Sequence, residues 1–305
     1  PTVDISASMR ARRLLSTSRA ADLVVTSTLN GVRTIRMNRQ ARLNAWTQPM
    51  IHSWNDSFNA AAVDESVEAV IFTGAATDGA AVDAGRDEYY CAGADLSGLF
   101  APKMPAALHA EIVAANESLF DAFLSFPKPL FAAVNGHAIG ASVTSATLCD
   151  GVIASPDATF HTPFAALGVP PEGCSSVLFE RIMGAEHAHA MLVEGWKPSA
   201  AEMLDAGFVQ SVVPRDELLD AAQTIAEQWV ASATPKRHGA QLAELKAVNA
   251  MESALLADAV FSLPFMEAQL AFARRRKKAQ LVRFFKVLIA TRPLWGLLLP
   301  APFQK

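Results

Sequence analysis

Two short runs of small residues have the composition expected of an oxyanion-binding site. Residues 91–96 (Cys-Ala-Gly-Ala-Asp-Leu) gather small side chains where a loop turns towards a helix, and residues 135–142 (Asn-Gly-His-Ala-Ile-Gly-Ala-Ser) have the pattern of a strand, a glycine turn and a helix start. Helix N-termini leave backbone N–H groups unpaired and carry a partial positive charge. Two such turns facing each other would bind an oxyanion from both sides. Each run taken alone is also an ordinary packing device.

The histidines and cysteines near these runs form no recognisable catalytic pattern. His137 and His161 lie in predicted strand or turn segments without a Ser/Asp partner pattern, so packing or hydrogen bonding is their expected role. Cys91 and Cys174 are expected to be small buried residues rather than nucleophiles. With Cys149 the total is three, and there is no CxxC pair, so neither a disulfide framework nor a metal site is expected.

Alternating strands and helices are predicted to position the two runs. Asn30-Gly31 joins two β-branched runs and is a strong signal for a type I′ hairpin. Buried strands are expected at Val67–Thr73, Leu130–Val134 and Gly151–Ala154, and their alternation with helices through about residue 184 is typical of an α/β domain. Helical spacing is found over residues 47–62, 104–125, 140–148, 216–231, 236–255 and 263–290.

Composition excludes two classes of protein. Of the 305 residues, 51% are hydrophobic and 18% are charged, which is incompatible with a largely disordered chain. Nowhere do eighteen apolar residues run together, so no membrane-spanning helix is expected.

Charge is distributed unevenly along the chain. Residues 1–43 contain eight Arg against two acids, and the nine basic residues after Glu267 are accompanied by no acid. The segment between them holds 9 basic and 28 acidic residues. Basic ends of this kind suit nucleic acid, acidic lipid or a phosphorylated cofactor, but also a targeting leader and a solvated helix face.

The first 21 residues resemble a targeting leader. Residues 5–21 contain four Arg, several Ser and Thr and no acid, which is typical of an organellar presequence and favours the mitochondrial matrix. The peroxisome is the alternative location. Arg13-Leu14 begins a near miss of an amino-terminal peroxisomal signal, and the carboxyl-terminal Phe-Gln-Lys is not of the Ser-Lys-Leu type.

Together the two small-residue runs resemble the enoyl-CoA hydratase/isomerase (crotonase) superfamily. The resemblance extends from about Ala21 to about Gln280 and is densest over Tyr90–Leu96 and Lys128–Gly184. Within the superfamily, the segments Ala-Thr-Phe-His-Thr-Pro-Phe (158–164) and Pro-Glu-Gly-Cys-Ser-Ser (171–176) are most similar to Δ3,Δ2-enoyl-CoA isomerases of the peroxisomal type.

The resemblance implies an α/β fold of the ClpP/crotonase type, a spiral of ββα units in two sheets followed by a helical region. It divides the chain into a leader (1–21), a spiral core (22–199), a helical oligomerisation region (200–280) and a carboxyl-terminal extension (281–305). A homotrimer or hexamer is expected. The extension is more apolar than an exposed terminus should be, so we expect it to cover a neighbouring subunit or to lie on a membrane surface.

The resemblance also implies which residues bind the substrate. The oxyanion-hole N–H groups fall on Ala94 and Ala141. The segment Arg42-Leu43-Asn44-Ala45 matches the part of the family that helps to hold the CoA nucleotide. The thioester and pantetheine would lie against the first small-residue run and the second glycine turn, at Ala92, Gly93, Asp95, Leu96 and Gly140.

The acid/base positions decide the expected reaction. Hydratases of the family use two glutamates, and Thr144 and Phe164 stand at those positions here. The isomerase carboxylate aligns with Glu172, which could move one proton from C2 to C4 of a 3-enoyl-CoA in unsaturated fatty-acid β-oxidation. The structural alternative is that Glu172 is a carboxylate near the first turn of the following helix and stabilises that helix. No cofactor is expected beyond the CoA of the substrate, and no DNA partner.

The sequence leaves three alternatives to a Δ3,Δ2-enoyl-CoA isomerase. The first is another acyl-CoA enzyme of the same fold, a dienoyl-CoA isomerase or a thioesterase, although residues 141–149 lack the acids that dienoyl isomerases use. The second is a non-catalytic acyl-CoA-binding member. The third is an RNA-binding member, for which the basic run Arg274–Lys278 is the only support.

Overall fold

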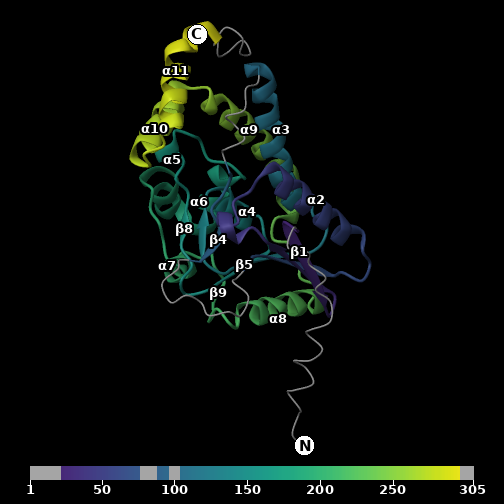
Figure 1. Ribbon diagram of the computed structural model, residues 1–305. Coiled ribbons are helices and arrows are strands. Elements are labelled where there is room, and N and C mark those ends of the chain that lie inside the picture. The colour runs from purple at the N-terminus through teal and green to yellow at the C-terminus, as the bar shows by residue number, and fades with distance from the viewer. Residues whose placement is uncertain (1–21, 76–87, 96–103, 296–305) are drawn as a thin grey trace, which may run out of the picture.

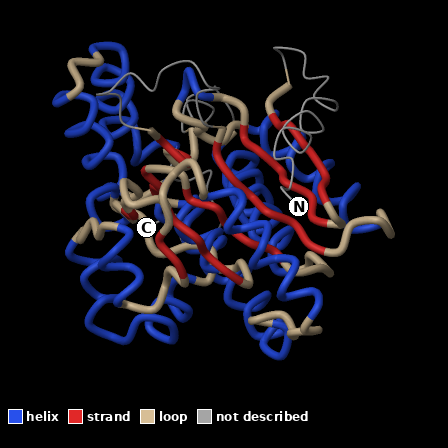
Figure 2. Tube along the Cα trace, turned by 90° about the horizontal axis from the view of Figure 1, so that it is seen from below, coloured by secondary structure: helices blue, strands red, loops and turns tan. Residues whose placement is uncertain are grey.

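The computed structural model describes residues 22–75, 88–95 and 104–295. The predicted leader, Leu96 and the last ten residues lie outside the described residues. The strands form two sheets, as the resemblance implies. The larger sheet has the order β1-β2-β3-β5-β7-β9, and the smaller sheet has the order β4-β6-β8. Figure 2 shows the strands running side by side with helices around them.

The larger sheet begins with the predicted hairpin. β1 (Val24–Leu29) and β2 (Val32–Met37) pair in antiparallel fashion across Asn30-Gly31, and both turn residues have positive φ, as a type I′ turn requires. The remaining strands pair in parallel: β3 (Ala69–Gly74), β5 (Leu130–Val134), β7 (Gly151–Ala154) and β9 (Ser211–Val212).

Both faces of the central strands are buried, which explains their uninterrupted apolar sequence. On one face, Ile71 and Phe131 pack with α8 (Leu218–Ala231), the helix at the lower end of Figure 1. On the other face, Phe72 stacks on Trp54 of α2 (Gln48–Val63), with ring centroids 3.9 Å apart. The alternation of strand side chains between two faces thus divides the core into two layers.

The smaller sheet carries the two small-residue runs. It consists of β4 (Tyr89–Cys91), β6 (His137–Ile139) and β8 (Phe160–His161), all parallel. β4 leads into the first run, and β6 lies within the second run, which continues into α4 (Ala141–Thr147). Because β4 and β6 are direct neighbours, the ends of both runs lie at one edge of this sheet.

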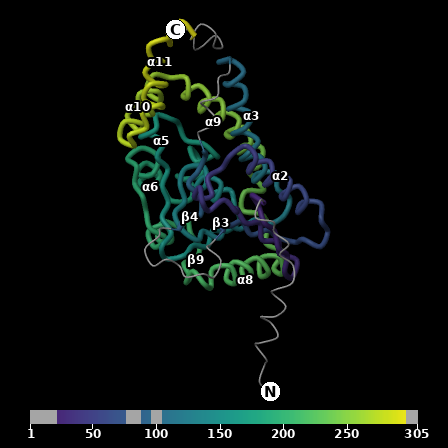
Figure 3. Tube along the Cα trace, in the orientation of Figure 1, coloured from purple at the N-terminus to yellow at the C-terminus, as the bar shows by residue number. Residues whose placement is uncertain are grey.

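The remaining helices lie around the sheets. α3 (Pro105–Leu124) packs along α9 (Leu242–Val260), as Figure 3 shows. Between these helices the Asn116 side chain donates to the Ser253 hydroxyl at 3.0 Å. The other helical elements around the sheets are η1 (Gln40–Arg42), α5 (Phe164–Leu167), α6 (Ser175–His189), η3 (Ala190–Glu194), α7 (Ala200–Asp205) and η4 (Gly239–Gln241).

The helix predicted over residues 263–290 is two helices, which corrects that expectation. α10 (Leu263–Arg275) ends before Lys277, a residue with φ of 53°, and α11 (Ala279–Trp295) folds back along α10. Phe285 of α11 is only 2% exposed and packs with Phe265 and Met266. The apolar side chains of the described part of the extension are thus partly covered by this chain itself, while Val287 and Leu294 remain exposed. The contact with a neighbouring subunit or a membrane stays a prediction.

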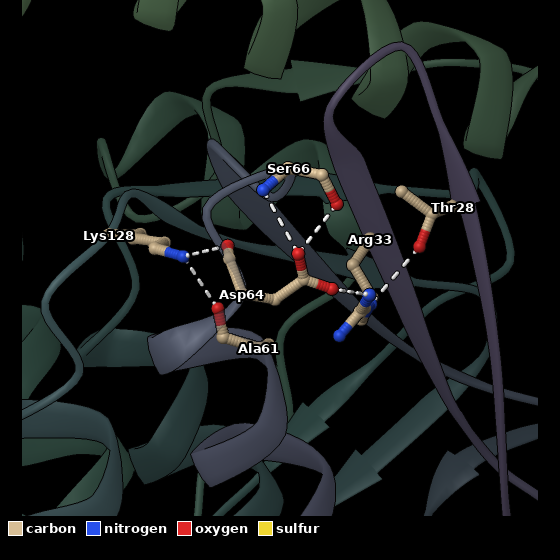
Figure 4. Close-up of polar contacts among 6 residues, drawn as sticks. All are labelled: Thr28, Arg33, Ala61, Asp64, Ser66 and Lys128. Carbon is tan, nitrogen blue, oxygen red and sulfur yellow. Dashed lines mark hydrogen bonds and ion pairs between the residues drawn. The ribbon is translucent and has the colours of Figure 1, made fainter.

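A polar cluster joins the end of α2 to the edge of the larger sheet (Figure 4). The Asp64 carboxylate accepts hydrogen bonds from the Ser66 hydroxyl at 2.6 Å and from the Arg33 guanidinium at 2.7 Å. The Lys128 ammonium donates to the carbonyl oxygens of Ala61 and Asp64, both at 2.7 Å. The bonds from Ser66 and then Arg33 lower the pKa of Asp64 to about 2.

Within the described residues, no single helix is both long and apolar enough to cross a membrane. The helical segments Gly239–Val260 and Leu263–Arg275 together reach that length and composition, but they are bent by 65° at the break between them.

Candidate active site

A cavity of about 410 Å³ contains most of the predicted site. It is bounded by the start of α2, both small-residue runs, α3, the segment from α5 to α6, and the α9–α10 turn. A surface groove of about 510 Å³ between α2 and α3 holds none of the predicted site residues. The predicted residues that line the cavity are Ala92, Gly93, Ala94, Asp95, Gly140, Ala141, Phe164 and Glu172.

The first small-residue run presents the Ala94 N–H to the cavity. Trp46 pairs with Ala94 as an isolated parallel bridge, in which Trp46 N–H donates to Gly93 O at 2.8 Å and Asp95 N–H donates to Trp46 O at 2.7 Å. These bonds occupy the groups on either side of Ala94, whose own N–H points the other way in such a ladder. In the part of the chain that the structure describes, the Ala94 N–H has no acceptor.

The second run presents the Ala141 N–H. Gly140 has φ of 60°, a value that glycine adopts without strain, and its N–H donates to His161 O at 2.8 Å. Ala141 is the first residue of α4, so its N–H has no partner within the helix. Over the described ranges it has no other acceptor either.

Two contacts hold the runs against each other. A Cβ on Gly93 would lie 2.5 Å from Ile139 O and 3.9 Å from Ala141 N, so only glycine allows this approach. The Ser142 hydroxyl accepts from Ile139 N–H at 2.8 Å and donates to Cys91 O at 3.0 Å. Ala94 and Ala141 therefore line one cavity, and their role as oxyanion donors stays a prediction.

Glu172 reaches the same cavity from a fixed turn between α5 and α6. Its carbonyl oxygen accepts from the Ser175 N–H at 3.2 Å and from the Ser175 hydroxyl at 2.7 Å. Gly173 and Cys174 follow with φ of 63° and 62°, and a Cβ on Gly173 would lie 2.5 Å from the Phe120 ring. This turn is packed too tightly for the Glu172 backbone to move freely.

The environment of Glu172 favours its protonated form. Burial, and secondarily the negative charge of Glu252, raise the pKa of the Glu172 carboxyl to about 8. Among the residues described, nothing donates a hydrogen bond to this carboxylate, and Phe164, Leu167 and Val169 line the cavity with it. A carboxyl with such a pKa can take a proton and return it near neutral pH.

The structure separates the residues predicted to bind CoA into two groups. Asp95 lines the cavity and pairs with Arg39 at 3.1 Å, a partner that the sequence did not indicate. Arg42 and Leu43 are exposed at the end of η1, and neither they nor Ala45 line the cavity. Their role towards the CoA nucleotide remains a prediction.

Buried Asn44 braces the segment that carries these residues. Its side-chain oxygen accepts from Arg39 N–H at 3.0 Å, and its amide donates to Tyr89 O at 3.1 Å. The segment is therefore tied to β4, the strand that leads into the first small-residue run.

The remaining candidates have structural roles. The Thr144 hydroxyl donates to Ala141 O at 3.2 Å, and Thr144 and Phe164 supply no carboxylate at the hydratase positions. His137 bonds to the Thr159 hydroxyl at 2.7 Å. All three cysteines are buried with free thiols, and burial raises the pKa of Cys91 and of Cys174 to about 12, so neither is an activated nucleophile.

Relatives among curated proteins include enoyl-CoA isomerases. The family profile described as "Enoyl-CoA hydratase/isomerase" matches residues 27–277. The chain is 40% identical over 197 residues to human "Enoyl-CoA delta isomerase 2", across 63% of this chain but only 46% of that protein. It is 32% identical over 273 residues to mouse "Enoyl-CoA delta isomerase 3, peroxisomal", across 85% of this chain and 80% of that protein.

Solved structures share the fold. An enoyl-CoA hydratase/isomerase from Pseudoalteromonas atlantica T6c superposes with a TM-score of 0.70 at 26% sequence identity, across 83% of this chain and 97% of that chain. The predicted fold class is thereby confirmed.

Proposed function

This chain belongs to the enoyl-CoA hydratase/isomerase family, and on that premise we propose that it is a Δ3,Δ2-enoyl-CoA isomerase. The observation that carries the proposal is the composition of the cavity: one carboxyl group with a raised pKa, Glu172, shares it with the N–H groups of Ala94 and Ala141, which have no acceptor among the described residues. An acyl-CoA substrate fits the family, and CoA enters as part of that substrate.

The proposed reaction moves one proton. The Glu172 carboxylate takes a proton from C2 of a 3-enoyl thioester, the electron pair moves into the thioester, and its oxygen becomes the anionic end of a dienolate. The N–H groups of Ala94 and Ala141 bind that oxygen. Glu172 then returns the proton to C4, the double bond settles between C2 and C3, and the carboxylate is regenerated. Losing one oxyanion donor typically costs about 10²–10³ in rate.

The same residues argue against efficient hydration. Adding water needs one group to activate the water and a second group to protonate the α-carbon. Asp95 is engaged by Arg39, Glu111 is exposed at the cavity, and Thr144 and Phe164 cannot act as bases. A single carboxylate suffices for isomerisation, whose two proton transfers occur on the same face of the substrate.

The proposal extends to the setting of the enzyme. We place the reaction in the β-oxidation of unsaturated fatty acids, in a homotrimer or hexamer in the mitochondrial matrix, with the peroxisome as the alternative location. These assignments are supported by the resemblance and by the Arg- and Ser-rich leader.

The test is an assay of the purified protein with a 3-enoyl-CoA, with the product identified by chromatography. The proposal predicts 2-trans-enoyl-CoA without a hydrated product. Release of free CoA would indicate a thioesterase. Turnover of a 3,5-dienoyl-CoA alone would indicate a dienoyl isomerase, and binding without turnover would indicate a non-catalytic member.

A further inference from the structure

A second glutamate lies behind the turn that carries Glu172. Glu252 of α9 is only 1% exposed. One of its carboxylate oxygens accepts from Cys174 N–H at 2.6 Å, and the other accepts from Ser176 N–H at 3.0 Å. These donors belong to the N-terminus of α6, where N–H groups lack partners within the helix and favour a negative charge. In the described ranges, no basic side chain pairs with Glu252.

Helix α9 thus fixes both the end of the Glu172 turn and the start of α6. Cys174 is held twice, since its thiol also bonds to Leu245 O of α9 at 3.2 Å. Ser175 holds the Glu172 carbonyl from the same place in the chain. Glu172 is therefore connected to the Glu252 carboxylate through Gly173, Cys174 and Ser175. All three are constrained by packing or hydrogen bonds, and Gly173 and Cys174 have positive φ.

The two carboxyl groups are not equivalent. Burial raises the pKa of both, but the Ser176 and Cys174 donors oppose the rise at Glu252. Glu172 has no such donors in the described part of the chain, and it also experiences the charge of Glu252. When like charges share a low-dielectric region, the group with the better hydrogen bonds ionises first.

We propose that Glu252 is a positioning residue for Glu172: its ionised carboxylate anchors the turn that presents Glu172 to the cavity, and its charge disfavours a second negative charge there. The proposal deepens the proposed function, on which its catalytic meaning rests. Because the charge of Glu252 raises the pKa of Glu172, the Glu172 carboxylate is a stronger base towards the weakly acidic proton at C2.

Few other charges compete with this pair. Cys174 is a neutral thiol at physiological pH, because its pKa is raised to about 12. Across the cavity, Asp95 is paired with Arg39, and Glu111 is exposed on α3. Other charged residues of the surrounding helices form the pairs Arg181–Glu244 between α6 and α9, and Lys246–Asp121 and His109–Asp258 between α9 and α3. Glu180 and Glu186 of α6 are exposed, and Glu117 of α3 is half-buried.

The first test needs no substrate. A raised pKa in the folded state means that the folded protein loses stability as pH rises from the ordinary glutamate range of about 4.5 to about 8. Glu172→Gln removes this loss, so the variant gains stability relative to wild type over that range. Urea unfolding of wild type, Glu172→Gln, Glu252→Gln and the double variant at several pH values completes a double-mutant cycle.

The proposal predicts that this pH-dependent gain is smaller in the Glu252→Gln background than in the wild-type background. An equal gain in both backgrounds would overturn it. Should Glu252→Gln fail to fold, Glu252→Asp decides the matter, because it retains the charge. The pH-dependent gain in stability from Glu172→Gln must persist in the Glu252→Asp background, and its disappearance there would contradict the proposal.

The second test follows kcat/KM with a 3-enoyl-CoA against pH. Glu252→Gln is expected to move the acid limb to lower pH by about one pH unit, whereas Glu252→Asp should leave the limb in place. Glu180→Gln removes an exposed carboxylate from α6 and is the matched control, with an unchanged limb. An unmoved limb in Glu252→Gln would refute the role of the charge. If wild type is inactive while the unfolding cycle shows coupling, the proposed function fails and the pairing of the two glutamates stands.

Discussion

The Ser142 hydroxyl donates a hydrogen bond to the Cys91 carbonyl oxygen at 3.0 Å, with the Ile139 carbonyl oxygen at the same distance, and the contact with Cys91 ties the second small-residue run to the first. Ser142 is fully buried and follows Ala141 directly. The spacing of the Ala94 and Ala141 N–H groups therefore depends on a side chain that does not line the cavity.

We expect Ser142→Ala to lower kcat by about tenfold or more, because displacement of one donor by a fraction of an ångström weakens binding of the dienolate oxygen. The buried Cys91 carbonyl also loses a partner, which should cost about 1–3 kcal/mol of unfolding free energy. Ser145→Ala is the control: this buried serine on the same helix donates only to Ser142 O, at 3.2 Å. An equal loss of kcat in both variants would mean that the Ser142–Cys91 hydrogen bond is not what sets the rate.

A comparison of Gly93 with Gly184 distinguishes the cost of a positive φ from the cost of crowding by neighbouring atoms. Their φ values are 80° and 79°, but a Cβ would meet Ile139 O at 2.5 Å only at Gly93. Alanine at either position should cost about 1–3 kcal/mol, because a residue with a Cβ rarely adopts such a backbone; Gly184, with φ 79° and ψ 164°, lies in a region almost exclusive to glycine. Gly93→Ala should in addition push the two turns apart and abolish most turnover. Thermal unfolding and initial rates on both variants check this, and a fully active Gly93→Ala would show that the turns can separate harmlessly.

The raised pKa of Glu172 predicts the pH dependence of catalysis. The reaction starts from the carboxylate, so kcat/KM should rise by about tenfold per pH unit and level off above about pH 8. A profile that is already flat at pH 6 would mean that Glu172 ionises like an ordinary glutamate or is not the base.

Helix α11 is expected to stabilise the chain that carries it. Phe285 is 2% exposed and Val287 is 62% exposed on the same helix. Phe285→Ala should therefore lower the unfolding free energy by about 3–5 kcal/mol, while Val287→Ala should change it little. Denaturant unfolding distinguishes the two, and equal small effects would mean that α11 does not pack on α10 in solution.

Local sequence signals predicted the fold class and the two small-residue runs of the candidate site. Asn30-Gly31 encodes its own hairpin, and the small-residue runs that carry Ala94 and Ala141 are contiguous in sequence. The sequence did not indicate the ion pair of Arg39 with Asp95 or the break near Lys277 that divides the predicted helix into α10 and α11. Arg39 is one of eight arginines in the first 43 residues, and the apolar spacing continues across the break between α10 and α11.

Glu252 was missed for a different reason. It lies 78 residues from Cys174, with several helices between them, and acts only through the folding of α9 against α6. Nothing in the helical pattern of α9 distinguishes this buried glutamate from a solvated one. A contact of this kind becomes visible only once the tertiary structure is known.

The most direct test of the central claim is the rate of 3-enoyl-CoA isomerisation by Glu172→Gln, measured beside its affinity for a saturated acyl-CoA. Glutamine keeps the shape of the side chain but cannot accept and return a proton. The account predicts a loss of at least about 10² in kcat with acyl-CoA affinity nearly unchanged, because binding uses backbone N–H groups and the cavity walls. Activity within tenfold of wild type would contradict the single-base mechanism.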